Sequence, residues 1–268
     1  MSTILEEIIA RKRACVEEAM RNADLEDLSA RASEATVTRR DFRSAISSLD
    51  RINVIAEFKR ASPSKGVIND SIDPNEAARM YSNGGAAAIS VLTEEDFFKG
   101  SLDDLRAIRS TVDLPILRKD FMIDEYQIYE SAAVGADAIL LIVAALTSEN
   151  LQRFQKLAYD LGMDTVVEVH DRVELEVAKS IGAKIIGVNN RDLRSFEVSL
   201  DVSRRLIEDA PKNAVMVSES GLRTRQDLIE LRNIGYSAFL IGETLMRSGN
   251  PERELRKLTE DAAELRAL

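Results

Sequence analysis

The sequence is poor in the residues on which several kinds of site depend. It contains one cysteine, Cys15, and one histidine, His170. A single cysteine excludes an intramolecular disulfide, and a single histidine excludes a metal cluster built from several histidines. Cys15 also belongs to a predicted N-terminal helix, far in sequence from every predicted strand end. We therefore expect neither a catalytic thiol nor a bound metal.

Long apolar runs and an export signal are also missing. No stretch of about eighteen apolar residues occurs, so no transmembrane helix and no membrane partner are expected. The N-terminal segment MSTILEEIIARKRACVEEAM is acidic and helical in pattern, unlike a signal peptide, which predicts a cytoplasmic protein. The formal net charge of −10 disfavours non-specific binding of nucleic acid. It does not disfavour a small anion, because charged groups at contact distance dominate.

Eight short apolar segments recur along the 268 residues and predict strands. Four of them start at a glycine and form a weak repeat, and the other four alternate with these. The repeat begins at Gly84, Gly135, Gly182 and Gly235, and the alternating segments begin at Asn53, Pro115, Asp164 and Asn213.

Six segments between these strands have apolar residues three and four apart, which is typical of amphipathic helices. Alternating strands and helices predict a parallel sheet covered by helices. Eight units of this length favour a closed (β/α)₈ TIM barrel, a single domain over 1–268. An open dinucleotide-binding sheet would have G-x-G-x-x-G after its first strand, where this chain has KRASPSKG.

The first 50 residues form a predicted N-terminal helical extension packed on the barrel. Two interpretations remain open for it. It either plugs the N-terminal end of the barrel or covers the active site.

Polar residues gather at the predicted C-terminal ends of the strands, where barrels of this kind carry their active sites. Glu57 and Lys59 lie two residues apart on strand one and so share a face, which is predicted to point into the barrel. Lys119 ends strand three, Glu168 lies near the end of strand five, and Asn189 ends strand six. Burial should lower the pKa of a lysine here and raise that of a carboxyl, which would yield an acid and a base without histidine. We expect His170 to be an auxiliary hydrogen-bonding residue.

Glycines directly follow the last two strands. Ser220 and Gly221 come after strand seven, and Gly242 comes after strand eight. Barrels often bind phosphate at this place through backbone N–H groups and a helix N-terminus. The sequence therefore predicts a phosphorylated small-molecule substrate, although two ordinary tight turns would give the same pattern.

At these residues the chain resembles the indole-3-glycerol-phosphate synthase family over nearly its whole length. The resemblance rests on several segments found in order, of which the E-x-K-x-x-S-P-S and R-K-D-F segments are the most specific. The main ones are IAEFKRASPSKG (55–66), SVLTEEDFFKGS (90–101), PILRKDFMIDEYQIYES (115–131), IGVNNRDL (186–193), SESGL (218–222) and IGETLM (241–246).

The resemblance implies an activity, a carboxy-lyase reaction of tryptophan biosynthesis that needs no cofactor or metal. The substrate would be 1-(2-carboxyphenylamino)-1-deoxyribulose 5-phosphate, which closes a ring onto its ketone carbon and loses carbon dioxide and water to give indole-3-glycerol phosphate.

The same resemblance implies roles for individual residues. Lys119 matches the general acid, Glu168 the general base, and Lys59 a lysine that contacts the substrate carboxylate. Glu57 matches a carboxylate that orders the lysines. The remaining matches are Asn189, which would orient the substrate; Arg191, which would steady Glu57 or Asn189; Ser62, Ser220, Gly221 and Gly242 at the substrate and phosphate site; and Phe98 and Phe121 as walls for the aromatic ring.

Two alternatives compete with this hypothesis. Phosphoribosylanthranilate isomerase, another phosphate-binding barrel, would need a cysteine base at the end of strand one, where this chain has Glu57 and Lys59. A non-catalytic barrel that binds a phosphorylated ligand would be expected to lose the acidic and basic groups, and this chain keeps them. Docking of other tryptophan-pathway enzymes cannot be demonstrated from the sequence.

Overall fold

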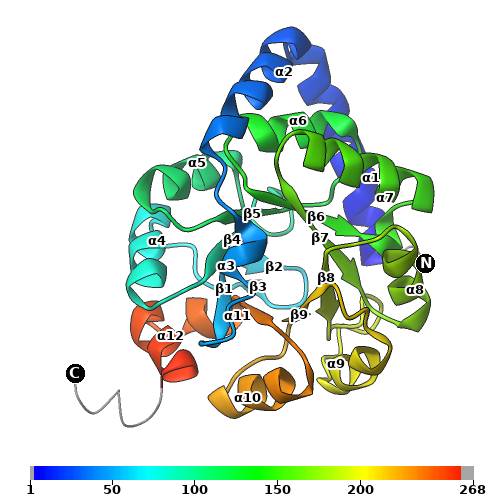
Figure 1. Ribbon diagram of the computed structural model, residues 1–268. Coiled ribbons are helices and arrows are strands. Elements are labelled where there is room, and N and C mark those ends of the chain that lie inside the picture. Colours follow the sequence, from blue (N-terminus) through cyan, green and yellow to red (C-terminus); the bar gives the residue numbers. More distant parts are fainter. Residues whose placement is uncertain (1–2, 261–268) are drawn as a thin grey trace.

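A computed structural model describes residues 3–260 as a closed barrel of eight parallel strands surrounded by helices (Figure 1). The strands pair in the order β1-β10-β9-β8-β7-β6-β5-β4, and β4 pairs with β1 to close the barrel. The predicted (β/α)₈ fold and its eight strands are confirmed. The strands are β1 (Asn53–Phe58), β4 (Ala88–Leu92), β5 (Ile116–Lys119), β6 (Ala138–Ile142), β7 (Asp164–Val169), β8 (Ile185–Asn189), β9 (Val215–Glu219) and β10 (Ala238–Ile241).

The six predicted amphipathic helices are all present on the outside of the barrel. Most begin at a Ser, Thr, Asp or Asn whose side chain accepts a hydrogen bond from the first turn, as Asp73 does for α4, and such caps satisfy N–H groups that lack helical partners. The outer helices are α4 (Pro74–Asn83), α5 (Leu102–Thr111), α6 (Glu125–Ala133), α7 (Ser148–Asp160), α8 (Arg172–Ser180), α9 (Asp201–Leu206), α10 (Arg225–Ile234), α11 (Glu243–Arg247) and α12 (Pro251–Thr259).

Shorter elements lie in the connections. A two-stranded hairpin of β2 (Ala61–Ser62) and β3 (Gly66–Val67) follows β1. Three 3₁₀ turns complete the described chain: η1 (Ala35–Thr38), η2 (Val143–Ala145) and η3 (Ile207–Asp209). Within residues 3–260, no helix combines the length and the apolar character that crossing a bilayer requires.

The segment before β1 reaches both ends of the barrel. It holds α1 (Ile4–Asn22), α2 (Leu25–Glu34), which packs beside α6, and α3 (Phe42–Ala45). Phe42 is fully buried with the residues that fill the barrel interior. One backbone N–H just before α3 and one within it donate to carboxylates at the starts of β6 and β7: Arg40 to Asp137 at 2.8 Å and Arg43 to Asp164 at 3.0 Å.

The two interpretations of the extension therefore apply to different helices. Helix α3 closes the N-terminal end of the barrel. Helix α1 lies at the opposite end, where Lys12 contacts Asp120, the residue after β5.

The plug formed by α3 should contribute strongly to stability. Replacing a buried phenylalanine by alanine typically costs about 3–5 kcal/mol, so Phe42→Ala should lower the free energy of unfolding by that amount in urea denaturation. Leu49→Ala is the control, because Leu49 is 85% exposed and its truncation should change little. Equal denaturation midpoints for the two variants would contradict a role of α3 as a plug.

Candidate active site

Four alternate strands each place one charged side chain in a layer at the C-terminal mouth. These residues are Glu57 on β1, Lys119 on β5, Glu168 on β7 and Glu219 on β9. Two positions before each of them, the same strand has an apolar residue that fills the barrel interior. These apolar residues are Ile55, Leu117, Val166 and Val217. Because strand residues two apart share a face, and layers inside such barrels come from alternate strands, the four charged residues form one layer above an apolar one.

Lys119 lies between two buried carboxylates. Its ammonium Nζ is 3.0 Å from Glu168 Oε2 and 3.1 Å from Glu219 Oε2. The side chains of Glu168 and Glu219 are 4% and 2% exposed, so water screens these contacts very little. The predicted meeting of Lys119 and Glu168 is present in the structure.

The pKa values of this cluster differ from the simple expectation. Burial acts to lower the pKa of Lys119, but Glu168, Glu219 and Glu57 outweigh it and raise it above the ordinary value. Burial acts to raise the pKa of Glu168, but Lys119 and His170 together lower it. The expected shifts of Lys119 and Glu168 were therefore wrong in sign, because ion pairing outweighs desolvation at both residues.

Glu219 is the carboxyl that behaves as expected. Burial and the neighbouring charges of Glu168 and Glu57 raise its pKa to about 7, although Lys119 opposes the shift. The cluster therefore holds a charged lysine, an ionised Glu168 and a carboxyl that changes protonation near neutral pH.

Glu57 and Lys59 form a second ion pair in the mouth. Lys59 Nζ is 2.5 Å from Glu57 Oε1, and the Glu57 side chain is 2% exposed. Gly242 lies against this carboxylate, because a Cβ atom added at Gly242 would be 2.3 Å from Glu57 Oε1. A residue with a side chain at position 242 would thus displace Glu57.

His170 extends the cluster toward α8. Its Nε2 is 3.4 Å from Glu168 Oε1 and its Nδ1 is 3.0 Å from Glu174 Oε2. Burial acts to lower the pKa of His170, but the two carboxylates raise it to about 10. The histidine is therefore charged at neutral pH and holds Glu168 in place, which agrees with an auxiliary role.

Asn189 and Arg191 connect the mouth to the loop after β1. The Arg191 backbone N–H donates to Asn189 Oδ1 at 3.0 Å, so it fixes the amide. The Arg191 guanidinium donates to Ser64 Oγ at 3.2 Å and to the Phe196 carbonyl at 3.3 Å. Of the two contacts expected for Arg191, the one with Asn189 is present, through the Arg191 backbone. The Arg191 side chain does not reach for Glu57 but holds the β2–β3 hairpin, which contains Ser62.

The two predicted aromatic walls lie next to each other. The ring centroids of Phe98 and Phe121 are 6.2 Å apart with an interplanar angle of 41°. The loop carrying Phe98 is held by the buried Glu94, whose Oε2 accepts the N–H groups of Phe97 and Phe98 at 2.8 and 3.1 Å. The chain therefore brings two aromatic rings from separate loops to one side of the mouth.

The predicted phosphate site has an unusual backbone. Ser220 and Gly221 both have positive φ, 68° and 81°, and this conformation is uncommon for a residue with a side chain. The buried Asn190 secures the turn by donating from Nδ2 to the Ser220 carbonyl at 3.1 Å. Nearby, α11 begins directly after Gly242, and the first N–H groups of a helix have no partners within it.

A cavity of about 660 Å³ adjoins the mouth on the side of β7 and β8. Its walls include His170, Asn189 and Arg191. Thr3, directly before α1, and Leu5, in the first turn of α1, also line it. Helix α1 thus forms part of the surroundings of the candidate active site.

Glu219 is the main member of the charged layer for which the sequence pattern predicts no role. It belongs to the motif SESGL, but the motif alone does not indicate its place in the layer. The rule that a layer comes from alternate strands could have identified Glu219. The first, third and fifth strands of the barrel (β1, β5 and β7) each contribute a charged residue to the layer, and β9 is the seventh. In the described part of the chain, no group of three or more His, Cys, Asp or Glu is placed to hold a metal ion.

Comparison with known proteins places this chain in a family. The indole-3-glycerol phosphate synthase family matches residues 5–258. The indole-3-glycerol phosphate synthase of Acetivibrio thermocellus is 47% identical over 255 residues, which is 95% of this chain and 98% of that protein. The enzyme of the same name from Neisseria meningitidis serogroup C is 46% identical over 261 residues, 96% of this chain and 100% of that protein.

Solved structures with much lower identity share the fold. The 3-hexulose-6-phosphate synthase of Salmonella typhimurium superposes with a TM-score of 0.62 at 15% identity, over 77% of this chain and 96% of that one. That likeness supports the barrel alone. The sequence relatives cover almost the full length and include every strand that contributes to the charged layer, so the chain belongs to the indole-3-glycerol phosphate synthase family.

Proposed function

We propose that the chain closes the indole ring of 1-(2-carboxyphenylamino)-1-deoxyribulose 5-phosphate, with Lys119 as general acid and Glu168 as general base. The observation that carries this proposal is the Lys119 ammonium between Glu168 and Glu219, at the mouth of a barrel that matches the family throughout. A phosphorylated substrate does not cross membranes freely, which supports the cytoplasm as the place of the reaction.

The first step needs a proton donor. A ring carbon of the substrate bonds to the ketone carbon, and the ketone oxygen takes a proton as the C=O electrons move onto it. Lys119 would supply that proton, because it is charged at neutral pH and lies at the barrel mouth with the other charged groups of the layer. Glu219, with a pKa of about 7, can return a proton to the lysine 3.1 Å away.

The later steps need a base. Carbon dioxide leaves with its bonding electrons shifting into the ring. The hydroxyl then takes a proton from Lys119, which Glu219 has recharged, and departs as water while a base removes a proton from the new ring. Lys119 lowers the pKa of Glu168 in the resting site. When Lys119 gives its proton to the departing hydroxyl, this effect is lost and Glu168 becomes a stronger base. Proton donation by Lys119 thus prepares proton removal by Glu168 in the same step.

The other residues would bind and orient the substrate. Lys59 would pair with the substrate carboxylate, and Glu57 would order it through their 2.5 Å contact. Asn189 would orient the substrate, with Arg191 and Ser62 holding the loop above it. The rings of Phe98 and Phe121 would enclose the anthranilate ring, and the phosphate would lie at Ser220, Gly221 and Gly242, beside the first turn of α11.

A direct assay separates this proposal from its alternatives. Indole formation gives a fluorescence change, and turnover of the substrate by the purified protein is the expected result. A non-catalytic barrel would bind the ligand without turnover. Phosphoribosylanthranilate isomerase activity is disfavoured, because it would need a cysteine at the end of β1. The one cysteine of the chain, Cys15, lies exposed on α1 instead.

Lys119→Ala should nearly abolish turnover while the substrate still binds. Loss of a principal acid should lower kcat by at least roughly 10²–10⁴-fold, measured by indole fluorescence together with a binding titration. Lys156→Ala is the control, since Lys156 is 75% exposed on α7 and should keep the wild-type rate. A kcat near that of the wild type would remove Lys119 from the mechanism.

Glu168→Gln keeps the shape of the side chain and removes the base. We expect kcat to fall strongly, by about 10²–10⁴-fold, while KM changes little, because the loss falls on the transition state. Steady-state kinetics beside the surface variant Glu176→Gln would measure this. A sharp rise in KM at constant kcat would instead make Glu168 a binding residue.

The phosphate site is best tested at Gly221. An added Cβ there would lie 2.5 Å from Val198 Cγ1, so the test pairs Gly221→Ala with Val198→Ala to remove that collision. The remaining strain of alanine at positive φ should shift the turn and weaken binding of indole-3-glycerol phosphate roughly tenfold. Val198→Ala alone is the control.

Binding of the same indole without its phosphate should be weak in the wild type and unchanged in the double variant. If the double variant folds and still prefers the phosphorylated ligand as strongly as the control does, the phosphate binds elsewhere. Gly242 is less suitable for this test, because a side chain there would also displace Glu57.

A further inference from the structure

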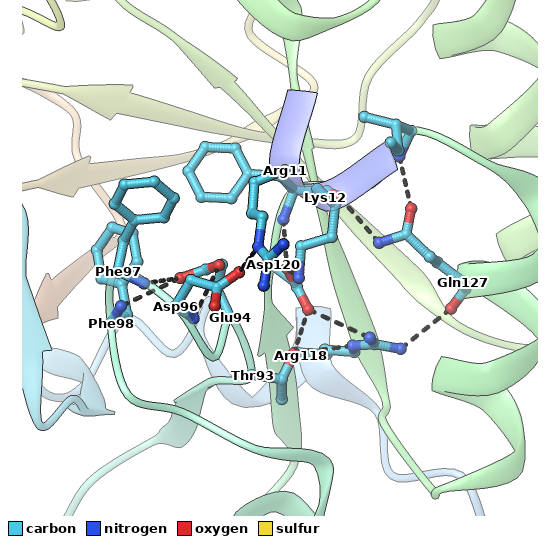
Figure 2. A network of polar contacts seen from close by, with 12 residues as sticks. Arg11, Lys12, Thr93, Glu94, Asp96, Phe97, Phe98, Arg118, Asp120 and Gln127 are labelled. Atoms are coloured by element: carbon cyan, nitrogen blue, oxygen red, sulfur yellow. Dashed lines mark hydrogen bonds and ion pairs between the residues drawn. The ribbon is translucent and has the colours of Figure 1, made fainter. Parts of the chain in front are cut away.

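Two adjacent basic residues of α1 reach the loops at the barrel mouth (Figure 2). Lys12 Nζ is 2.7 Å from Asp120 Oδ1, and Arg11 Nε is 2.7 Å from Asp96 Oδ2. The two ion pairs differ in exposure. The side chains of Lys12 and Asp120 are 10% and 1% exposed, whereas those of Arg11 and Asp96 are 59% and 37% exposed.

Lys12 occupies the middle of the buried face of its helix. The buried residues of α1 are Ile8, Lys12 and Val16, four positions apart and therefore on one side of the helix. A lysine at such a position loses hydration that an apolar residue would not lose, and apolar replacements of buried ion pairs are often as stable. Packing alone therefore does not account for a charged residue here.

Asp120 is held on every side. Its Oδ1 accepts from Lys12 and from the Phe121 N–H at 2.8 Å, while its Oδ2 accepts from Thr93 Oγ1 at 2.6 Å and from Arg118 Nη2 at 3.2 Å. A carboxylate can accept about four hydrogen bonds, so these four contacts use its full accepting capacity. Burial acts to raise the pKa of Asp120, but Lys12 and Arg118 outweigh it and lower the pKa.

This carboxylate fixes the residues on both sides of it in the chain. Lys119 precedes Asp120, and Phe121 follows it. Thr93 also donates its backbone N–H to the Lys119 carbonyl at 3.1 Å, so it clamps the same peptide from β4. Only small displacements of a catalytic group are tolerated, since a shift of about 1 Å can cost 10²-fold in rate.

The barrel supplies all but one of these restraints. Thr93 follows β4, and Arg118 of β5 is tied to α6 through Glu130 at 2.8 Å. Because Arg118 is shared between Asp120 and Glu130, it does not neutralise Asp120 alone. Lys12 supplies the second cation, and it comes from the segment that precedes the barrel.

We propose that Lys12 is a positioning residue for the reaction, whose ammonium holds Asp120 so that Lys119 stays at its catalytic position. Helix α1 then acts on catalysis from outside the barrel. The inference rests on the proposed function, because Lys119 is its target.

The test compares neighbouring residues of α1. Lys12→Met should lower kcat by about tenfold, within the range that a displaced catalytic group allows, and Lys12→Arg should recover most of the rate. Arg11→Met is the matched control: it removes an equal charge from the same helix but breaks an exposed pair, so kcat should stay within about twofold. Circular dichroism at the assay temperature verifies that each variant is folded.

A double-variant comparison separates positioning from mere stability. If Lys12 acts through Lys119, adding Lys12→Met to Lys119→Ala should leave the residual kcat unchanged, because the group to be positioned is already gone. The inference is overturned if Lys12→Met keeps the wild-type kcat, or if it lowers the residual rate by the same factor as in the wild type.

Failure to fold and failure of the wild type to turn over the substrate are two further outcomes of the experiment. If Lys12→Met does not fold, Lys12→Gln replaces it, since glutamine keeps a hydrogen-bond donor and lacks the charge, and the same results decide. If the wild-type protein does not turn over the substrate, the proposed function fails. If the wild type is active and Lys12→Met matches it, only the inference fails.

Discussion

The ammonium of Lys119 lies between the buried carboxylates of Glu168 and Glu219, and the rest of the mouth is arranged around that contact. Two buried carboxylates and one largely buried lysine together carry a net charge of −1 when all three are ionised. The excess is expressed in the pKa of Glu219, which rises to about 7. His170 adds a positive charge on the far side of Glu168. Burial and ion pairing together thus determine which groups of the site are protonated at neutral pH.

The barrel provides this contact because it stacks side chains in layers. Helix α3 closes the bottom, apolar residues fill the middle, and the charged layer of alternate strands lies on top. Each charged residue stands on an apolar residue of its own strand, which fixes its direction. The loops that follow the strands then add what the layer lacks: aromatic rings, a hairpin held by Arg191, and a turn at Ser220 and Gly221.

Much of this arrangement could be predicted from the sequence, and the exceptions have a common cause. The strands, the outer helices and the positions of Lys119, Glu168, Glu57 and Lys59 follow from local patterns and from the geometry of parallel strands. The directions of the pKa shifts do not, because they depend on distances between strands that are far apart in sequence. The same holds for Lys12 and Asp120, which 107 intervening residues separate. No local pattern of α1 indicates that one member of its buried face pairs with the end of β5.

The plug at the bottom of the barrel also bears on how the chain assembles during synthesis. The residues around α3 emerge from the ribosome before any barrel strand, yet their partners, Asp137 and Asp164, lie at the starts of β6 and β7. Helix α3 therefore has nowhere to dock until more than half of the chain has been made. Local helices can form as they appear, but the lower end of the barrel stays open to water until β6 and β7, its fourth and fifth strands, have been made and can hold α3.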